Sequence, residues 1–179
     1  MPIELNNKAT LLKKSLLIFY KDKENLEKFV NVIEKNTEYS LRIIEWFCSN
    51  YSKKYNIIYK LDKNTEFNVY LSYKSQLDSY QKKQFDPFKR NHKGFDKFEI
   101  CNGIYTTVGQ LNFFRWCINN KIFDYIQKNI KSIKDDMNKS INYIKKKGDN
   151  KTRKKRQPLS LSATRVCIKR YTRAVIEFN

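Results

Sequence analysis

The chain has 179 residues, 40% of them hydrophobic and 15% aromatic, which is enough for one compact domain with a buried core. Its 37 Lys and Arg against 18 Asp and Glu give a net charge of +19, which attracts polyanions such as nucleic acid or an anionic membrane surface. The low content of 4 Gly and 3 Pro excludes a collagen-like or loop-rich chain.

The first 54 residues predict a small helical part. Apolar residues gather over residues 9–20, and Asp22 is placed to cap a second helix. That helix carries apolar residues at helical spacing, namely Leu26, Phe29, Val30 and Ile33. We expect a third helix to open at Asn36 and Thr37, with Trp46 as a core anchor.

The chain then becomes rich in residues that favour β-strands. Two hairpins are predicted, the first pairing residues 57–61 with 67–71 and the second pairing residues 97–100 with 104–106. Asn102 and Gly103 form a strong turn signal for the second hairpin. Between the hairpins, residues 72–84 predict a helix, which ends where Asp86 precedes Pro87.

Residues 107–118 predict a central aromatic helix. Thr107 followed three residues later by Gln110 is typical of a capping box at a helix start. The apolar side chains behind it are Leu111, Phe113, Phe114, Trp116, Cys117 and Ile118. Two interpretations stay open: a core helix, or an aromatic platform on which bases stack.

A long periodic run follows. Its apolar residues recur at steps of three and four, at Ile122, Ile126, Ile130, Ile133, Met137, Ile141 and Ile144. This stripe could pack on the domain or form a dimer seam. Gly148 is expected to end the helix, and residues 166–168 and 174–178 predict strands that tie the C-terminus into the sheet.

These elements predict an α+β fold with an N-terminal helical part, a small antiparallel sheet, an aromatic helix, a long helix and a C-terminal strand. We divide the chain into a helical part over residues 1–54 and an α+β core over residues 55–146. A basic loop over residues 147–158 and a C-terminal strand segment over residues 159–179 complete the same domain.

Catalytic residues, a metal site and a cofactor are not expected. The four cysteines are scattered without metal-ligand spacing, and the one histidine is His92. No nucleophile-elbow, phosphate-loop or zinc-protease motif is present. The cysteines favour a reducing compartment without a structural disulfide. Neither a signal peptide nor a membrane span is predicted.

The strongest candidate for function is a basic segment, residues 145–173. It holds twelve Lys and Arg against Asp149 alone. The predicted phosphate-contacting residues are Lys145, Lys146, Lys147, Lys151, Arg153, Lys154, Lys155, Arg156, Arg165, Lys169 and Arg170. A solvated loop and a nuclear-import signal remain alternatives for the same run.

A second patch mixes cations with aromatic rings around residues 80–97. Cations can follow a nucleic-acid backbone while rings stack on bases, which is typical of a single-strand groove. The residues that we assign to it are Lys82, Lys83, Lys89, Arg90, Phe85 and Phe88, with Lys93 and Lys97 nearby. Alternatively, Phe85 and Phe88 staple the loop to the core.

Three motifs resemble an uncharacterised protein family of nucleocytoplasmic large DNA viruses, the giant and algal viruses. They are residues 73–77, residues 84–88 and residues 107–116, and the similarity extends over residues 38–178. The family carries a cysteine and a further arginine after the Phe-Asp-Pro-Phe motif, where this chain has Lys89, Arg90 and Asn91. A catalytic role for that cysteine therefore does not transfer. The resemblance implies a viral source and no assigned reaction.

Charge and resemblance together predict a non-enzymatic, largely sequence-independent nucleic-acid-binding protein that serves viral genome packaging or expression. The expected partner is nucleic acid, DNA ahead of RNA, and no membrane. The expected locations are the virion and the viral factory in the infected-cell cytoplasm, or the nucleus. The alternative is a structural or scaffold protein of the virion or factory, acting through a homodimer or a virion protein partner.

Overall fold

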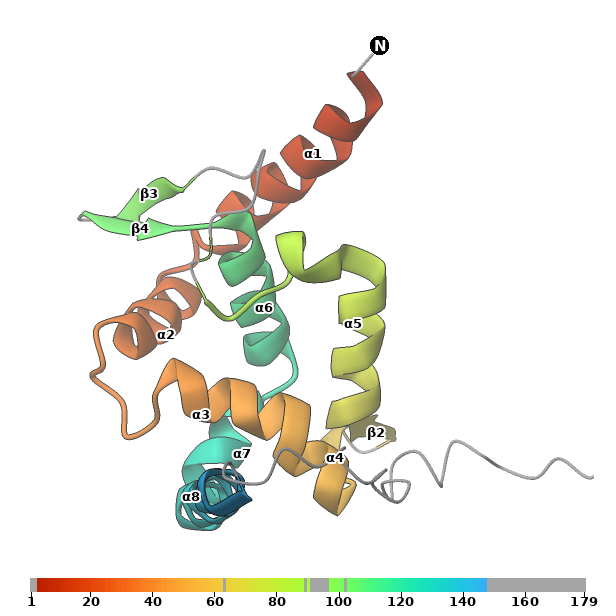
Figure 1. Ribbon diagram of the computed structural model, residues 1–179. Helices are drawn as coiled ribbons and strands as arrows, with labels where there is room; N and C mark the ends of the chain where they lie inside the picture. The colour runs from red at the N-terminus through yellow and green to blue at the C-terminus, as the bar shows by residue number, and fades with distance from the viewer. Residues whose placement is uncertain (1–2, 63, 89, 91–96, 102, 148–179) are drawn as a thin grey trace, which may run out of the picture.

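The computed structural model describes residues 3–62, 64–88, 90, 97–101 and 103–147 and shows the α+β class that the sequence predicts (Figure 1). The helices are α1 (Ile3–Phe19), α2 (Lys23–Ile33), α3 (Leu41–Trp46), the π-helical turn η1 (Phe47–Tyr51), α4 (Ser52–Tyr55), α5 (Val69–Gln84), α6 (Val108–Asn119), α7 (Ile122–Lys128) and α8 (Ile130–Lys147). The strands are β1 (Ile58–Asp62), β2 (Thr65–Asn68), β3 (Phe98–Cys101) and β4 (Ile104–Thr106).

Helix α6 is the centre of the fold and contacts α1, α2, α5 and α7 (Figure 1). Leu111, Phe113 and Phe114 are fully buried, as expected for a helix that is apolar on most sides. The Phe114 ring meets the Phe29 ring of α2 edge-on, with centroids 5.0 Å apart. The core-helix interpretation is confirmed, and these rings are not available as a platform for bases.

The N-terminal helices follow the sequence closely, with one shifted boundary. Asp22 caps α2 as predicted, accepting a 2.9 Å hydrogen bond from the Glu24 backbone N–H. The prediction that the third helix opens at Asn36 and Thr37 is wrong, because α3 begins after Ser40. The Thr37 hydroxyl instead donates to the Tyr39 carbonyl over 2.8 Å, which favours a local turn over a helix start.

Helices α3 and α4 run on from one another through η1. Two serine hydroxyls bond carbonyls four residues earlier, Ser49 to Glu45 over 2.7 Å and Ser52 to Cys48 over 2.8 Å. Cys48 is fully buried here, as is Cys117 on α6, and both are free thiols. Burial, reinforced by the neighbouring Cys48, raises the pKa of Cys117, so both cysteines serve as small core residues.

The antiparallel pairing forms as two separate two-stranded sheets, β1 with β2 and β3 with β4. Gly103 has a φ of 78°, which confirms the predicted turn of the second hairpin. The predicted strand over residues 67–71 is wrong beyond Asn68, where α5 begins. The Asn68 side chain caps this helix by accepting a 3.0 Å hydrogen bond from the Leu71 N–H.

The predicted long helix is interrupted at Asn129, which separates α7 from α8. The Asn129 side chain donates to the Tyr125 carbonyl over 2.9 Å and so satisfies the end of α7. Ile133 of α8 is fully buried, and α8 contacts α3 and η1. This half of the stripe therefore packs on the domain. Helix α8 is described as far as Lys147, and Gly148, which is predicted to end it, lies outside the described residues.

The predicted C-terminal strands, residues 166–168 and 174–178, lie outside the described residues. Within the described part of the chain, no helix is both long and apolar enough to cross a membrane.

Candidate nucleic-acid interface

The basic segment begins at the end of α8. Lys145, Lys146 and Lys147 are the last described residues of this helix. The remaining predicted phosphate contacts lie outside the described residues, namely Lys151, Arg153, Lys154, Lys155, Arg156, Arg165, Lys169 and Arg170. What the structure defines is the helix that leads into them.

Asp136 ties α8 to the helices in front of it. Its buried carboxylate accepts a 3.2 Å hydrogen bond from the Trp46 indole, a 3.0 Å hydrogen bond from the Tyr55 hydroxyl and a hydrogen-bonded ion pair from Lys54. Burial acts to raise the pKa of Asp136, but the hydrogen bonds from Lys54, Tyr55 and Trp46 outweigh it and hold this pKa below its usual value. A charged, well-bonded anchor therefore precedes the basic segment.

Only some of the described residues of the second patch lie at the protein surface. Lys82 and Lys83 are exposed at the end of α5, but Phe85 is 1% exposed and its ring packs 5.2 Å from that of Phe113. Phe85 therefore belongs to the core, as the staple alternative held, and its ring is unavailable to bases. Lys89, His92, Lys93 and Phe95 lie outside the described residues.

Arg90 is engaged within the protein. One guanidinium nitrogen lies 3.4 Å from the buried carboxylate of Asp86, and the guanidinium carbon lies 5.0 Å from the centre of the Phe88 ring. These contacts cover the half-buried Phe88 and offset part of the charge of Arg90. Three other cations of the second patch are described. Lys82, Lys83 and Lys97 are exposed, and none of them pairs with a carboxylate of the described residues.

Two of the sequence motifs form one structural unit, because residues 84–88 dock on the start of α6. The Asp86 N–H donates to the Gly109 carbonyl over 3.1 Å, and the Asn112 amide donates to the Gln84 carbonyl over 2.9 Å. A Cβ on Gly109 would lie 3.1 Å from the Lys83 carbonyl oxygen, so glycine permits this close approach.

Gln110 completes the docking and alters the predicted capping box. Thr107 caps α6 as expected, accepting a 3.2 Å hydrogen bond from the Gln110 N–H. The Gln110 side chain does not return to Thr107. Its amide donates to the Pro87 carbonyl over 2.9 Å, and its oxygen accepts from the Thr106 hydroxyl over 2.9 Å. The buried glutamine is used to hold residues 84–88.

The third motif, residues 73–77, packs on the same unit. The buried ring of Tyr73 lies 5.9 Å from that of Phe85 and 6.0 Å from that of Trp116. The Trp116 indole donates to the Ser72 hydroxyl over 3.0 Å. The three motifs are thus explained in large part by mutual packing around α6.

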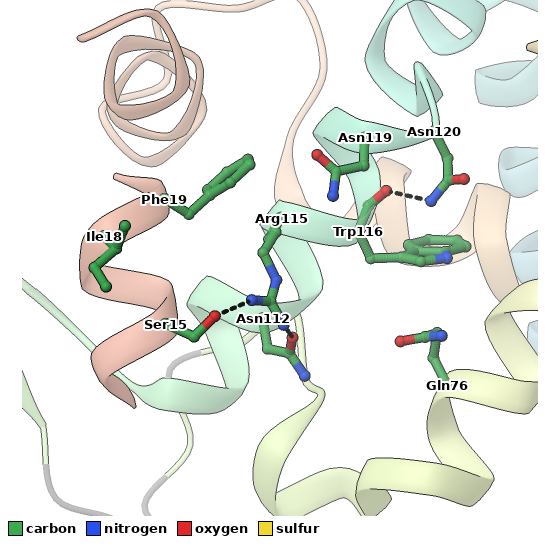
Figure 2. A pocket seen from close by; sticks show the side chains of 9 residues that line it. All are labelled: Ser15, Ile18, Phe19, Gln76, Asn112, Arg115, Trp116, Asn119 and Asn120. Atoms are coloured by element: carbon green, nitrogen blue, oxygen red, sulfur yellow. Dashed lines mark hydrogen bonds between the residues drawn. The ribbon is translucent and has the colours of Figure 1, made fainter. Parts of the chain in front are cut away.

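A pocket of about 530 Å³ lies beside this core and was not foreseen from the sequence (Figure 2). Its lining includes Ser15 and Phe19 of α1, Gln76 of α5, and Arg115, Trp116 and Asn119 of α6. Arg115 donates to the Ser15 hydroxyl over 3.1 Å and to the Asn112 side-chain oxygen over 2.9 Å. The one available signal was an arginine interrupting the apolar run of α6.

Among the described residues, no group of three or more His, Cys, Asp or Glu side chains is arranged to hold a metal ion.

Comparison with known proteins places the chain in a family. Residues 4–155 match the family of unknown function DUF7197. The chain belongs to this family. The match takes in α1 and α2 as well as the three motifs, so DUF7197 covers nearly the whole described fold.

A viral relative agrees with the resemblance of the motifs. The uncharacterized protein L507 of Acanthamoeba polyphaga mimivirus is 36% identical over 148 residues, which cover 78% of this chain and 57% of that protein. The chain thus spans less than two thirds of the length of this relative. No solved structure matches the chain.

Proposed function

We propose that this member of DUF7197 is a non-enzymatic protein that binds nucleic acid largely independently of base sequence. The observation that carries the proposal is the net charge of +19, concentrated in the basic segment with twelve Lys and Arg against Asp149. Lysine and arginine that meet phosphates release condensed counterions whatever the bases are. Binding of this kind serves genome packaging or expression.

The described fold supports this role by offering a firm attachment for the basic segment. Helix α8, which leads into it, is held by the buried Asp136 and by Ile133. Lys82, Lys83 and Lys97 add exposed positive charge elsewhere on the domain. DNA is the expected partner ahead of RNA, because the motifs resemble proteins of large DNA viruses. The sites of action would be the virion and the viral factory, or the nucleus.

The test is binding of the full chain to double- and single-stranded DNA and RNA as salt is raised from about 50 to 200 mM. The decisive variant replaces five cations with glutamine: Lys151, Arg153, Lys154, Lys155 and Arg156. A matched control makes the same number of changes at exposed lysines on the described fold: Lys8, Lys14, Lys21, Lys128 and Lys131.

The five-cation variant should weaken binding to all sequences alike, and the salt slope should fall by about 0.9 for each lost phosphate contact on duplex DNA. The control should keep most of the affinity. Equal losses of affinity in the two variants would show that binding depends only on the overall charge of the protein and not on the basic segment. No binding to any nucleic acid at the lowest salt would contradict the proposal.

A second candidate is a scaffold protein that acts through protein contacts. It is favoured by apolar side chains left exposed on α1, where Leu11 is 63% and Ile18 is 66% exposed. Sedimentation of the full chain with and without Leu11→Asp and Ile18→Asp separates the two roles. A self-associating protein that becomes monomeric on these changes would favour the scaffold, and an unchanged monomer would count against it.

A further inference from the structure

The pocket around Arg115, which we call the Arg115 pocket, lies over α6 between α1 and α5 (Figure 2). Helix α6 packs against both neighbours and supplies the floor. Ser15 and Phe19 face the pocket from α1, and Gln76 faces it from α5. Its volume of about 530 Å³ falls in the range typical of small-molecule sites.

Arg115 lines the pocket and is held in place by two hydrogen bonds. The Ser15 hydroxyl and the Asn112 side-chain oxygen each accept from a different guanidinium nitrogen. Both acceptors are neutral, and no Asp or Glu is among the described residues that line the pocket. Because arginine has five N–H donors, others remain for a ligand. The arrangement suits an anion, and phosphate in particular.

Two side-chain amides complete the polar part of the lining. Gln76 and Asn119 have no hydrogen-bond partner for their amides within the described part of the chain, and each offers both donors and an acceptor. Amides of this kind match the mixed donor and acceptor edges of nucleobases.

Aromatic surface lies next to these groups. The half-buried ring of Phe19 projects into the pocket region, and Trp116 closes the floor with its indole held by Ser72 (Figure 2). A flat apolar surface beside polar amides is what a base requires for stacking and edge recognition together.

We propose that the Arg115 pocket holds one nucleotide unit, with its phosphate on Arg115 and its base between Phe19 and the amides of Gln76 and Asn119. The nucleotide can be a free nucleoside monophosphate or the terminal unit of a single strand. None of the described residues that line the pocket belongs to the basic segment, so this inference goes beyond the sequence-independent binding proposed above.

An acidic peptide is the competing ligand, because a carboxylate would also pair with Arg115. The nucleotide is favoured by the size of the pocket, which exceeds the needs of a single carboxylate, and by the two open amides beside an aromatic ring. The net charge of +19 also attracts phosphorylated ligands to the surface.

The experiment is isothermal titration calorimetry of the full chain with AMP, CMP, GMP and UMP. Arg115→Gln should weaken the best-bound nucleotide by about tenfold or more, the size expected for a lost charge-assisted hydrogen bond. The matched control is Arg42→Gln, which removes the same charge from an exposed position on α3 and should leave affinity unchanged. Circular dichroism establishes that both variants are folded.

Two further variants keep the test decisive if Arg115→Gln fails to fold. Gln76→Ala and Asn119→Ala should each weaken the nucleotide severalfold while leaving binding of inorganic phosphate unchanged. The same nucleoside without its phosphate should bind more weakly than the nucleotide. Equal affinity for the nucleoside and the nucleotide, or no effect of either amide, would overturn the assignment of the pocket.

Competition then separates the two sources of the nucleotide. A 5′-phosphorylated tetranucleotide that displaces the monophosphate and is weakened by Arg115→Gln points to a strand end, and failure to displace points to a free nucleotide. A pocket that takes an acidic heptapeptide but none of the four monophosphates contradicts the proposal. The five-cation variant of the basic segment should retain monophosphate binding, so failure of one proposal is distinguishable from failure of the other.

Discussion

The indole N–H of Trp46 donates to Oδ2 of Asp136 over 3.2 Å, joining two residues that are 90 positions apart in the chain. The sequence predicts Trp46 as a core anchor. It is only partly buried, and its contribution includes the polar edge of the ring as well as the area that it covers. The pair couples α3 to α8 and depends on the charge of Asp136.

Asp136→Asn should lower the free energy of unfolding at pH 7 by about 2 kcal/mol, because it weakens hydrogen bonds to a buried carboxylate. Urea denaturation followed by circular dichroism measures the change. Asp135→Asn, at the neighbouring exposed position, should alter stability by less than about 0.5 kcal/mol. Equal effects of the two changes would show that only overall charge matters.

The contribution of Asp136 should also depend on pH. Its pKa is lower in the folded protein than in the unfolded chain, so its stabilisation is present above the unfolded value and is lost as the pH falls through the folded value. The difference in unfolding free energy between the wild type and Asp136→Asn should therefore shrink below about pH 4. Urea titrations at a series of pH values test this, and a difference that grows in acid would contradict the assignment.

Gly109→Ala should destabilise the protein by about 1 kcal/mol, although alanine normally favours a helix. The new Cβ would meet the backbone of residues 83–86, which hydrogen bonds to α6 prevent from moving away. Thermal unfolding provides the measurement. Ser132→Ala at an exposed position of α8 is the control and should be neutral or slightly stabilising.

Thr107→Ala should cost about 1 kcal/mol by removing the side-chain cap of α6. Thr107→Ser keeps the hydroxyl that accepts from the Gln110 N–H and should retain most of the stability. Chemical denaturation of both variants separates the stability lost with the capping hydrogen bond from the stability lost with the methyl group. A serine variant as unstable as the alanine variant would mean that packing decides the effect.

Ile133→Ala should lower the free energy of unfolding by about 3 kcal/mol, as expected for a fully buried isoleucine. Sedimentation of the same variant should show the oligomeric state of the wild type, because this side chain packs inside one chain. A change of oligomeric state at unaltered stability would revive the dimer seam for this half of α8.

Local signals in the sequence predicted most elements correctly. The caps at Asp22 and Thr107, the turn at Gly103 and the apolar stripe of α6 depend on residues within a few positions of one another. The strand predicted over residues 69–71 was wrong because it also depended on local signals. Their alternating pattern favours a strand, and only the capping geometry of Asn68 shows that a helix begins there.

Contacts over long distances in the chain could not be predicted. Gln110 bonds the Pro87 carbonyl 23 residues away, and no local pattern distinguishes that from a return to Thr107. The Arg115 pocket brings together residues from three helices. An aromatic residue in a basic stretch can either stack on bases or pack in the core, and the sequence does not separate these roles for Phe85. Only its packing against Phe113 shows that it belongs to the core.

The central place of α6 has a consequence for synthesis on the ribosome. The Tyr20 hydroxyl donates to the Leu111 carbonyl, and Phe29 packs on Phe114, so the first two helices find their partners far downstream. At about 5–20 residues per second, several seconds pass between the emergence of Phe29 and that of Phe114. During that interval the nascent chain presents apolar surface to chaperones and proteases, and the emergence of α6 decides when this exposure ends.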